Sequence, residues 1–284
     1  MNIDIVGYTG FVGSNLCLSH KFDHYYNSKN ISDAYGTAPD ILVYAGVTGT
    51  KYIANKNPEK DKQIIESAIS NIEKIAPKKL VLISTIDTFV KPDNINEDEE
   101  PTSQSDFVYG FHRRILEEWV KKNVENYLIV RLPGIYGANL KKNYIYDLIN
   151  PIPQVLSQSL YESFSSKEEI IKKIYKSSED GFYHIINNNN FPKSEILAAF
   201  ARNNFSALNF TDSRGFFQYY NLKFLWRHIQ IALRHNLKIL NIATEPFTIS
   251  ELYTYVSGKT MKNECSRAVS YTHLRAHETT LHLV

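Results

Sequence analysis

The sequence has 284 residues, of which 43% are hydrophobic and 22% charged, a composition typical of a globular protein with a sizeable core and not of a disordered chain. Its 32 basic and 30 acidic side chains leave a net charge of +2, which excludes a broad electrostatic attraction for nucleic acid. A membrane-spanning helix needs about 18 consecutive apolar residues, and no apolar run comes near this length. No leader pattern opens the sequence. We therefore expect a cytoplasmic protein that binds neither membrane nor nucleic acid.

Strand and helix patterns alternate in the first half. Apolar runs predict strands at 3–7, 40–47, 78–86 and 126–137, and a weaker strand at 23–30. The spacing of apolar residues predicts helices between them, at 11–22, 57–75 and 109–123. Near-continuous apolar strands that alternate with helices favour an α/β fold, a Rossmann-type doubly wound parallel sheet.

The pattern loosens after about residue 137, which predicts a first domain at 1–138 and a smaller C-terminal substrate-binding region at 139–264. A strand-like run at 237–244 fits either this region or the main sheet. Residues 265–284 follow no structural period and resemble translated sequencing-adaptor read-through, so we expect a non-native tail. Cys17 and Cys265 lie far apart and outside any Cys/His cluster, so we expect neither a disulfide nor a metal site.

Three glycines, Gly7, Gly10 and Gly13, follow the first predicted strand at intervals of three and open the next helix. In this context the first glycine permits a tight turn, the second lets a pyrophosphate approach the backbone, and the third lets the helix pack on the strand. Free N–H groups at a helix N-terminus favour an anion. The pattern therefore predicts a dinucleotide site.

The second strand ends at Asn27, Ser28 and Lys29, where a protein that selects NAD usually has an acid for the ribose 2′-hydroxyl. A hydroxyl and a lysine are suited to a 2′-phosphate instead. We therefore expect NAD(P) binding with a preference for NADP, and the alternative is that Lys29 is an ordinary solvated lysine.

Ser84 and Thr85 end a predicted parallel strand, at the edge where open α/β sheets bind ligands. Tyr109 and Arg113 lie four apart on the next helix, so they share one face, whereas the adjacent His112 is expected to be a partly exposed helix histidine. A phenol with a pKa near 10 needs a nearby positive charge to exchange protons near neutrality, which Arg113 can supply.

The series GYTGFVGS, LVLISTIDTF, YGFHRRILEEW and IVRLPGIYG resembles the extended short-chain dehydrogenase/reductase family of NAD(P)-dependent nucleotide-sugar epimerases, dehydratases and reductases. The resemblance implies that Thr85, Tyr109 and Arg113 are catalytic. Motif and resemblance together predict the cofactor-binding residues Gly7, Thr9, Gly10, Phe11, Val12, Gly13, Asn27, Ser28, Lys29, Ala45, Gly46, Ser84, Tyr109, Arg113 and Pro133.

Two departures from the family pattern bear on the reaction. Arg113 replaces the lysine of Y-x-x-x-K, which in the family holds the nicotinamide ribose and lowers the tyrosine pKa; arginine keeps the charge but places its donors differently. Ile86-Asp87 stands where the family's dehydratases have Asp-Glu, so hydride transfer or epimerisation is favoured over dehydration. Asp87 is expected to be a structural cap or rim hydrogen-bonder rather than a catalytic acid.

The sequence thus predicts an NAD(P)-dependent oxidoreductase or epimerase of a nucleotide-linked sugar, with Tyr109 as acid and base. The alternative is a non-catalytic NAD(P)-binding sensor or scaffold of the same fold, because a fold guarantees no reaction. The family resemblance suggests a homodimer, for which the amphipathic segment LEEWVKKN at 116–123 offers a pairing face.

Overall fold

The computed structural model describes residues 1–91, 95–186 and 191–264, so the proposed tail at 265–284, with Cys265, lies outside the described residues. The described chain forms two compact units. The first comprises Met1–Asn139 and Phe216–Phe247, and the second comprises Leu140–Gly215 and the chain after Phe247.

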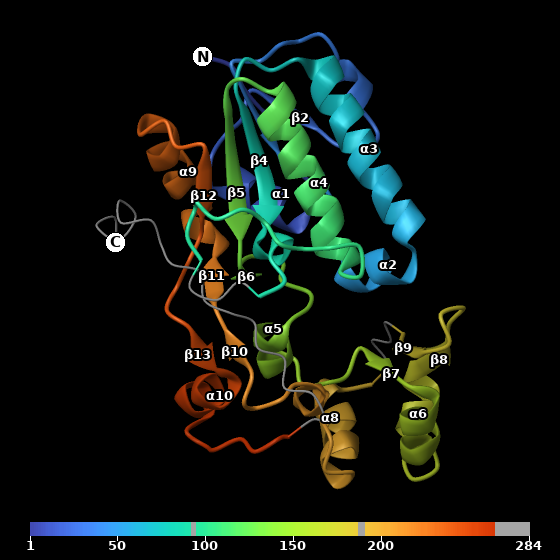
Figure 1. Cartoon of the computed structure of the whole chain (residues 1–284). Coiled ribbons are helices and arrows are strands. Elements are labelled where there is room, and N and C mark those ends of the chain that lie inside the picture. Colours follow the sequence, from blue (N-terminus) through green and yellow to red (C-terminus); the bar gives the residue numbers. More distant parts are fainter. Residues whose placement is uncertain (92–94, 187–190, 265–284) are drawn as a thin grey trace. The chain divides into compact units, whose positions relative to one another are not determined.

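The first unit contains the elements β1 (Ile3–Val6), α1 (Phe11–Ser19), β2 (His24–Tyr26), β3 (Ile41–Tyr44), α2 (Lys51–Lys56), α3 (Pro58–Ile75), β4 (Leu80–Thr85), α4 (Val108–Asn123), β5 (Tyr127–Leu132), β6 (Gly134–Tyr136), β10 (Phe216–Phe217), β11 (Tyr219–Asn221), α9 (Leu225–Arg234) and β12 (Ile239–Asn241) (Figure 1). Short 3₁₀ turns are η1 (Ile31–Ala34), η2 (Ile86–Thr88) and η4 (Leu222–Phe224). The strand β13 (Phe247–Thr248) lies at the boundary between the units.

Six parallel strands form the central sheet in the order β12-β5-β4-β3-β1-β2. The chain passes from β1 to β2 on one side and then crosses to β3 on the other, so the direction of winding reverses between β1 and β3. Open α/β sheets bind ligands outside the carboxyl ends of the strands at such a reversal. This edge carries Gly7 after β1 and Thr85 at the end of β4. The strand-like run that could belong to either region contributes β12 to this sheet.

Helices cover both faces of the sheet, which explains the continuous apolar strands. On one face Ile5, Val43 and Val81 pack against Leu16 of α1 and Ile229 of α9. The other face packs against α3 and α4, which lie side by side in Figure 1, through apolar residues that include Leu42, Leu80, Leu82, Ile65, Ile72 and Leu116. The predicted doubly wound α/β fold is confirmed.

The longest helix, α3, shows why the sequence marks its ends so clearly. Pro58 occupies the first turn, and the Asn57 side chain accepts a hydrogen bond from the Lys60 N–H at 3.1 Å. At the other end Ala76 takes a left-handed conformation with φ 52° and donates its N–H to Ile72.

The second unit contains α5 (Tyr144–Ile149), β7 (Val155–Leu156), α6 (Gln158–Ser165), α7 (Glu169–Ile174), β8 (Tyr175–Ser177), β9 (Tyr183–Ile185), α8 (Lys193–Arg202), the 3₁₀ turn η3 (Ala207–Phe210) and α10 (Ile249–Ser257). Its strands form an antiparallel sheet in the order β7-β9-β8. A core around Phe164, Ile171 and Phe200 joins this sheet to the helices α6, α7 and α8.

Two expectations about α4 are corrected. The apolar side of LEEWVKKN is not a pairing face, because Leu116 and Val120 are 2% and 0% exposed and pack into the core of their own unit. His112 is buried instead of partly exposed, and its Nδ1 lies 2.8 Å from Asp61. In the described parts of the chain, no helix combines the length and hydropathy needed to cross a bilayer.

Candidate cofactor and catalytic site

The turn after β1 requires glycine at its first position. Gly7 has φ +90°, a left-handed conformation, and donates its N–H to the Tyr26 carbonyl at 2.8 Å. A Cβ on Gly7 would lie 2.5 Å from the backbone of Ala45, the residue that follows β3. The turn therefore lies directly against the ends of both neighbouring strands, β2 and β3, and the contact of Ala45 with a cofactor stays a prediction.

The other two glycines have different surroundings. A Cβ on Gly13 would lie 2.1 Å from the Gly7 carbonyl oxygen, so α1 can pack this closely only with glycine there. A Cβ on Gly10 would meet only the Gly7 oxygen, at 3.3 Å, and Gly10 is exposed. Space for a ligand therefore remains beside the Gly10 backbone, at the N-terminus of α1. The first turn of α1 contains no acid that would repel an anion there. This cradle fits the diphosphate of a dinucleotide.

The remaining residues of the glycine loop divide between solvent and core. Thr9 is exposed, whereas Phe11 and Val12 are half-buried and pack against the core beside α1. Gly46 is exposed, and a Cβ there would lie 3.0 Å from Val6.

The turn after β2 places Ser28 and Lys29 in solvent at the same sheet edge. Asn27 Oδ1 accepts the Lys29 N–H at 2.8 Å, and Asn30 Oδ1 accepts the Asn27 N–H at 2.8 Å. These asparagine contacts fix the turn, so that the exposed hydroxyl and ammonium groups follow the strand that accepts the Gly7 N–H.

Thr85 and Asp87 form a small hydrogen-bonded turn at the end of β4. The Thr85 hydroxyl donates to Asp87 Oδ2 at 3.1 Å, and the Asp87 N–H donates to Thr85 Oγ1 at 3.2 Å. Asp87 Oδ1 lies 2.6 Å from Lys51 Nζ. Ile86, at the position where the dehydratases of the resembling family have an acid, is an apolar residue that is 5% exposed and packs with Phe89. Thr85 is thus the residue that caps this turn, and the Asp87 carboxylate is a hydrogen-bond and ion-pair partner, the second of the two roles expected from the sequence.

Tyr109 lies at the start of α4, and its burial dominates its acidity. The side chain is 8% exposed, and burial raises the pKa of the phenol to about 12. The Arg113 charge and a hydrogen bond with Thr85 lower this pKa, while the carboxylates of Asp87 and Asp61 raise it. The structure therefore brings Thr85, Tyr109 and Arg113 together, but the positive charge only partly offsets the burial.

Arg113 donates to protein groups from two of its three guanidinium nitrogens. Nη1 donates to Asp61 on α3, and Nη2 donates to the Thr48 carbonyl at 2.5 Å. The guanidinium lies 4.0 Å from the centre of the Tyr109 ring, and the side chain is 4% exposed. This arrangement places the charge against the phenol, while the role of holding a ribose stays a prediction.

Ser84 belongs to a separate buried network below the sheet edge. Its hydroxyl donates to Glu117 Oε1 at 2.5 Å, and Arg131 Nη2 donates to Glu117 Oε2 at 2.7 Å. Both charged side chains are 0% exposed. Pro133, which follows β5, is also buried. The network ties the ends of β4 and β5 to α4 and thereby fixes the surroundings of Thr85.

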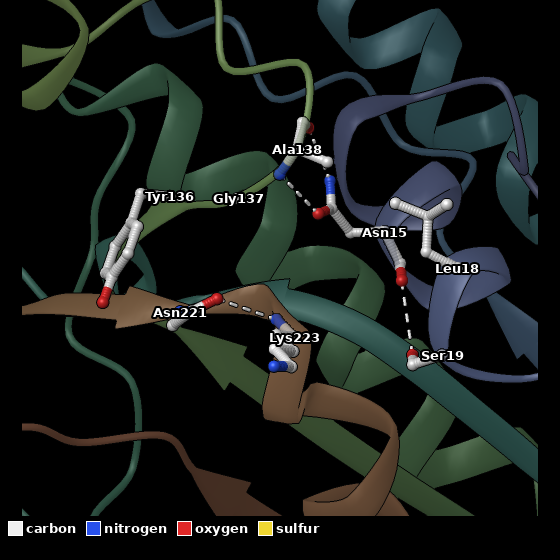
Figure 2. Close-up of a pocket in the computed structure, with 8 residues that line it drawn as sticks. All are labelled: Asn15, Leu18, Ser19, Tyr136, Gly137, Ala138, Asn221 and Lys223. Atoms are coloured by element: carbon white, nitrogen blue, oxygen red, sulfur yellow. Dashed lines mark hydrogen bonds between the residues drawn. The ribbon is translucent and has the colours of Figure 1, made fainter. Parts of the chain in front are cut away.

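Asn15 on α1 connects the glycine helix to the segment after β6. Its Nδ2 donates to the Ala138 carbonyl at 3.0 Å, and its Oδ1 accepts the Ala138 N–H at 2.9 Å (Figure 2). A Cβ on Gly137 would lie 2.5 Å from that oxygen, which explains the glycine. A cavity of about 420 Å³ borders this contact, but neither Thr85 nor Tyr109 lines it, so it is not the predicted catalytic site.

Sequence reasoning missed Lys51, Asp61, Asn15 and Glu117. For two of them a signal was present, because Asp61 lies on the apolar stripe of α3 with Ile65 and Glu117 lies on the buried face of α4. An acid at a core position of a helix indicates a buried partner. In the described residues, no three His, Cys, Asp or Glu side chains gather as a metal site would require.

Comparison with solved structures finds the same fold in several proteins. dTDP-4-dehydrorhamnose reductase from Bacillus anthracis, in complex with NADP, is 16% identical over 100% of this chain and 92% of its own, with a TM-score of 0.64. UDP-N-acetylglucosamine 4-epimerase from Bacillus cereus is 13% identical over 99% of this chain and 91% of its own, with a TM-score of 0.60.

A third solved structure, RMD from Pseudomonas aeruginosa complexed with NADPH, is 13% identical over 99% of this chain and 90% of its own, with a TM-score of 0.61. Neither the family models nor the curated proteins compared with the sequence give a match. At these identities the likeness establishes the fold alone.

Proposed function

We propose that the chain is an NAD(P)-dependent oxidoreductase or epimerase of a nucleotide-linked sugar, with a preference for NADP. The observation that carries the proposal is the position of the Gly7–Gly13 turn and the Thr85–Tyr109 pair at the carboxyl edge of one parallel sheet. The solved structures with this fold include a reductase in complex with NADP and a sugar-nucleotide epimerase.

The residues present fit such a cofactor. The backbone around Gly10 would hold the diphosphate, and Ser28 and Lys29 would hold a 2′-phosphate. When bound, the nicotinamide would accept or supply a hydride. The role of 139–264 as the substrate-binding region stays a prediction.

The chain's own catalytic groups would move the proton. The Tyr109 phenol donates a proton to a substrate oxygen, or accepts one from it, and the Thr85 hydroxyl hydrogen-bonds to the same oxygen. Arg113 stabilises the phenolate through the charge that it holds against the ring. Because Ile86 replaces a second acid, simple hydride transfer or epimerisation is favoured over dehydration.

Cofactor binding is the first test of the proposal. Titration of the protein with NADPH and with NADH, followed by nicotinamide fluorescence, should give tighter binding of NADPH. Lys29→Met should weaken binding of NADPH but not of NADH, and the exposed Lys21→Met is the matched control. Binding of neither nucleotide by the folded protein would contradict the proposal.

Turnover tests the catalytic assignment. In a screen of nucleotide-linked sugars, Tyr109→Phe should lower turnover by about 100-fold or more with unchanged cofactor affinity. Tyr255→Phe is the control, because Tyr255 is 90% exposed. Equal turnover of Tyr109→Phe and the unmodified protein would exclude Tyr109 as the acid and base.

Two observations favour a second candidate, a non-catalytic NAD(P) sensor. Arg113 donates from Nη1 and Nη2 to Asp61 and Thr48, and burial of Tyr109 raises the pKa of its phenol to about 12. The Arg113→Lys variant distinguishes the two functions. An enzyme should keep measurable turnover with lysine at this position, whereas a sensor turns over no substrate in either form.

A further inference from the structure

Lys51, the first residue of α2, brings a second cation to the catalytic pair, and no sequence motif includes it. Its Nζ lies 2.6 Å from Asp87 Oδ1 and 5.9 Å from the centre of the Tyr109 ring. Its side chain is 34% exposed and that of Asp87 is 13% exposed. Partial burial of both groups makes this ion pair less screened than one on an open surface.

The ion pair extends to the catalytic hydroxyl through Asp87. While Lys51 contacts Oδ1, the other carboxylate oxygen, Oδ2, accepts the Thr85 hydroxyl hydrogen bond at 3.1 Å. The position of the ammonium group thus orients the carboxylate, and the carboxylate orients Thr85.

We propose that Lys51 is a positioning residue of the Tyr109 site, which neutralises Asp87 and thereby both orients the Thr85 hydroxyl and reduces the negative charge that opposes the Tyr109 phenolate. The catalytic meaning of this role rests on the proposed function. The electrostatic role itself concerns only residues of this chain and can be measured without cofactor or substrate.

The charges around Tyr109 come from four elements and fall into two pairs. Arg113 on α4 contacts Asp61 on α3, and Lys51 on α2 contacts Asp87 in η2. The buried His112 also contacts Asp61. Because Arg113 is already matched by Asp61, loss of the Lys51 charge would leave Asp87 as the uncompensated group beside the phenol.

In the Y-x-x-x-K pattern a single lysine, four residues after the tyrosine, supplies the positive charge beside the phenol, whereas here two cations share this role. The guanidinium of Arg113 is fixed by Asp61 and Thr48, with its central carbon 4.0 Å from the centre of the Tyr109 ring. Lys51 is a compact ammonium on a flexible stem, with three donors and partial exposure. The two cations therefore have different roles: Arg113 provides a fixed positive charge beside the phenol, and Lys51 neutralises the Asp87 carboxylate.

The test measures the titration of Tyr109 directly. The protein is produced with a difluorinated tyrosine, whose more acidic phenol titrates within the pH range of the folded state, and fluorine NMR follows the phenols. Tyr109→Phe assigns the Tyr109 signal. The variants are Lys51→Met, Lys51→Arg and Lys51→Met/Asp87→Asn, and Lys56→Met on the same helix is the control.

Lys51→Met should raise the Tyr109 titration midpoint by about 0.5 to 1 pH unit, because Asp87 is then unopposed. Lys51→Arg should keep the Tyr109 midpoint close to that of the unmodified protein. In the double variant the midpoint should equal that of the unmodified protein or lie below it. Lys56→Met should leave the midpoint unchanged. If Lys51→Met does not fold, Asp87→Asn provides the test, since it should lower the midpoint.

An unchanged midpoint in folded Lys51→Met, or in Asp87→Asn where that variant provides the test, would overturn the proposal. A rise that persists in the double variant would also overturn it, because the effect would then not pass through Asp87. A protein that binds no nucleotide but shows the expected midpoints would refute the proposed function and leave the electrostatic role of Lys51 standing.

Discussion

Removal of the Arg131 guanidinium should destabilise the first unit strongly. Arg131 and Glu117 are both 0% exposed. Arg131 donates to Glu117 from Nη2 at 2.7 Å and from Nε at 3.1 Å, and Ser84 donates at 2.5 Å. Arg131→Met would leave a buried carboxylate with a single neutral donor. Breaking a buried pair in this way costs about 3–5 kcal/mol of unfolding free energy.

The double variant Arg131→Met/Glu117→Gln removes both charges and keeps an acceptor for Ser84. It should recover most of the lost stability, because the penalty in the single variant comes from the unpaired charge and not from the missing contact. Arg227→Met, at an exposed position, should change the free energy of unfolding by less than about 0.5 kcal/mol.

The assay is equilibrium unfolding in urea followed by tryptophan fluorescence. The two tryptophans of the chain, Trp119 and Trp226, both pack into the core of the first unit, so the signal reports this unit. A loss below about 1 kcal/mol in Arg131→Met, or a double variant no more stable than the single one, would refute the reasoning from an unpaired buried charge.

Two further predictions concern the glycine turn and the second unit. Gly13→Ala should lower the melting temperature, because its Cβ would lie 2.1 Å from the Gly7 oxygen, whereas Gly10→Ala should leave melting nearly unchanged and weaken NADPH binding in a fluorescence titration. Burial raises the pKa of the Asp147 carboxyl to about 6. The unfolded chain therefore loses this proton at lower pH than the folded chain does. As the pH rises from about 4 to 6, Asp147 makes folding less favourable. Asp147→Asn should remove this part of the pH dependence in urea unfolding, and an identical pH dependence in both proteins would contradict it.

The central sheet could be predicted from the sequence because its strands are buried on both faces. Runs such as Ile41–Tyr44 and residues 80–83 at the start of β4 are apolar at every position, a pattern typical of strands buried on both faces. The short strands of the second unit could not be predicted. Val155–Leu156 and Tyr183–Ile185 have two or three residues each, too few to show a period of two.

The candidate site was predictable where its residues follow strands or share a helix face. Thr85 ends a buried strand and Tyr109 and Arg113 lie one helical turn apart, so local sequence places them. Asp61 and Lys51 reach the same site from elements about fifty residues away from α4. No local pattern reports such a contact, because it depends on how α2 and α3 pack beside α4.

The contacts of Arg113 also constrain how this chain can change during evolution. Its guanidinium is held from α3 by Asp61 and from the loop after β3 by Thr48. Lysine at this position would give Asp61, which is 4% exposed, a different cationic partner, so the effect of this change should depend on the residue at position 61. Arg113 and Asp61 therefore act as one electrostatic unit, and we expect related chains to gain or lose the two residues together.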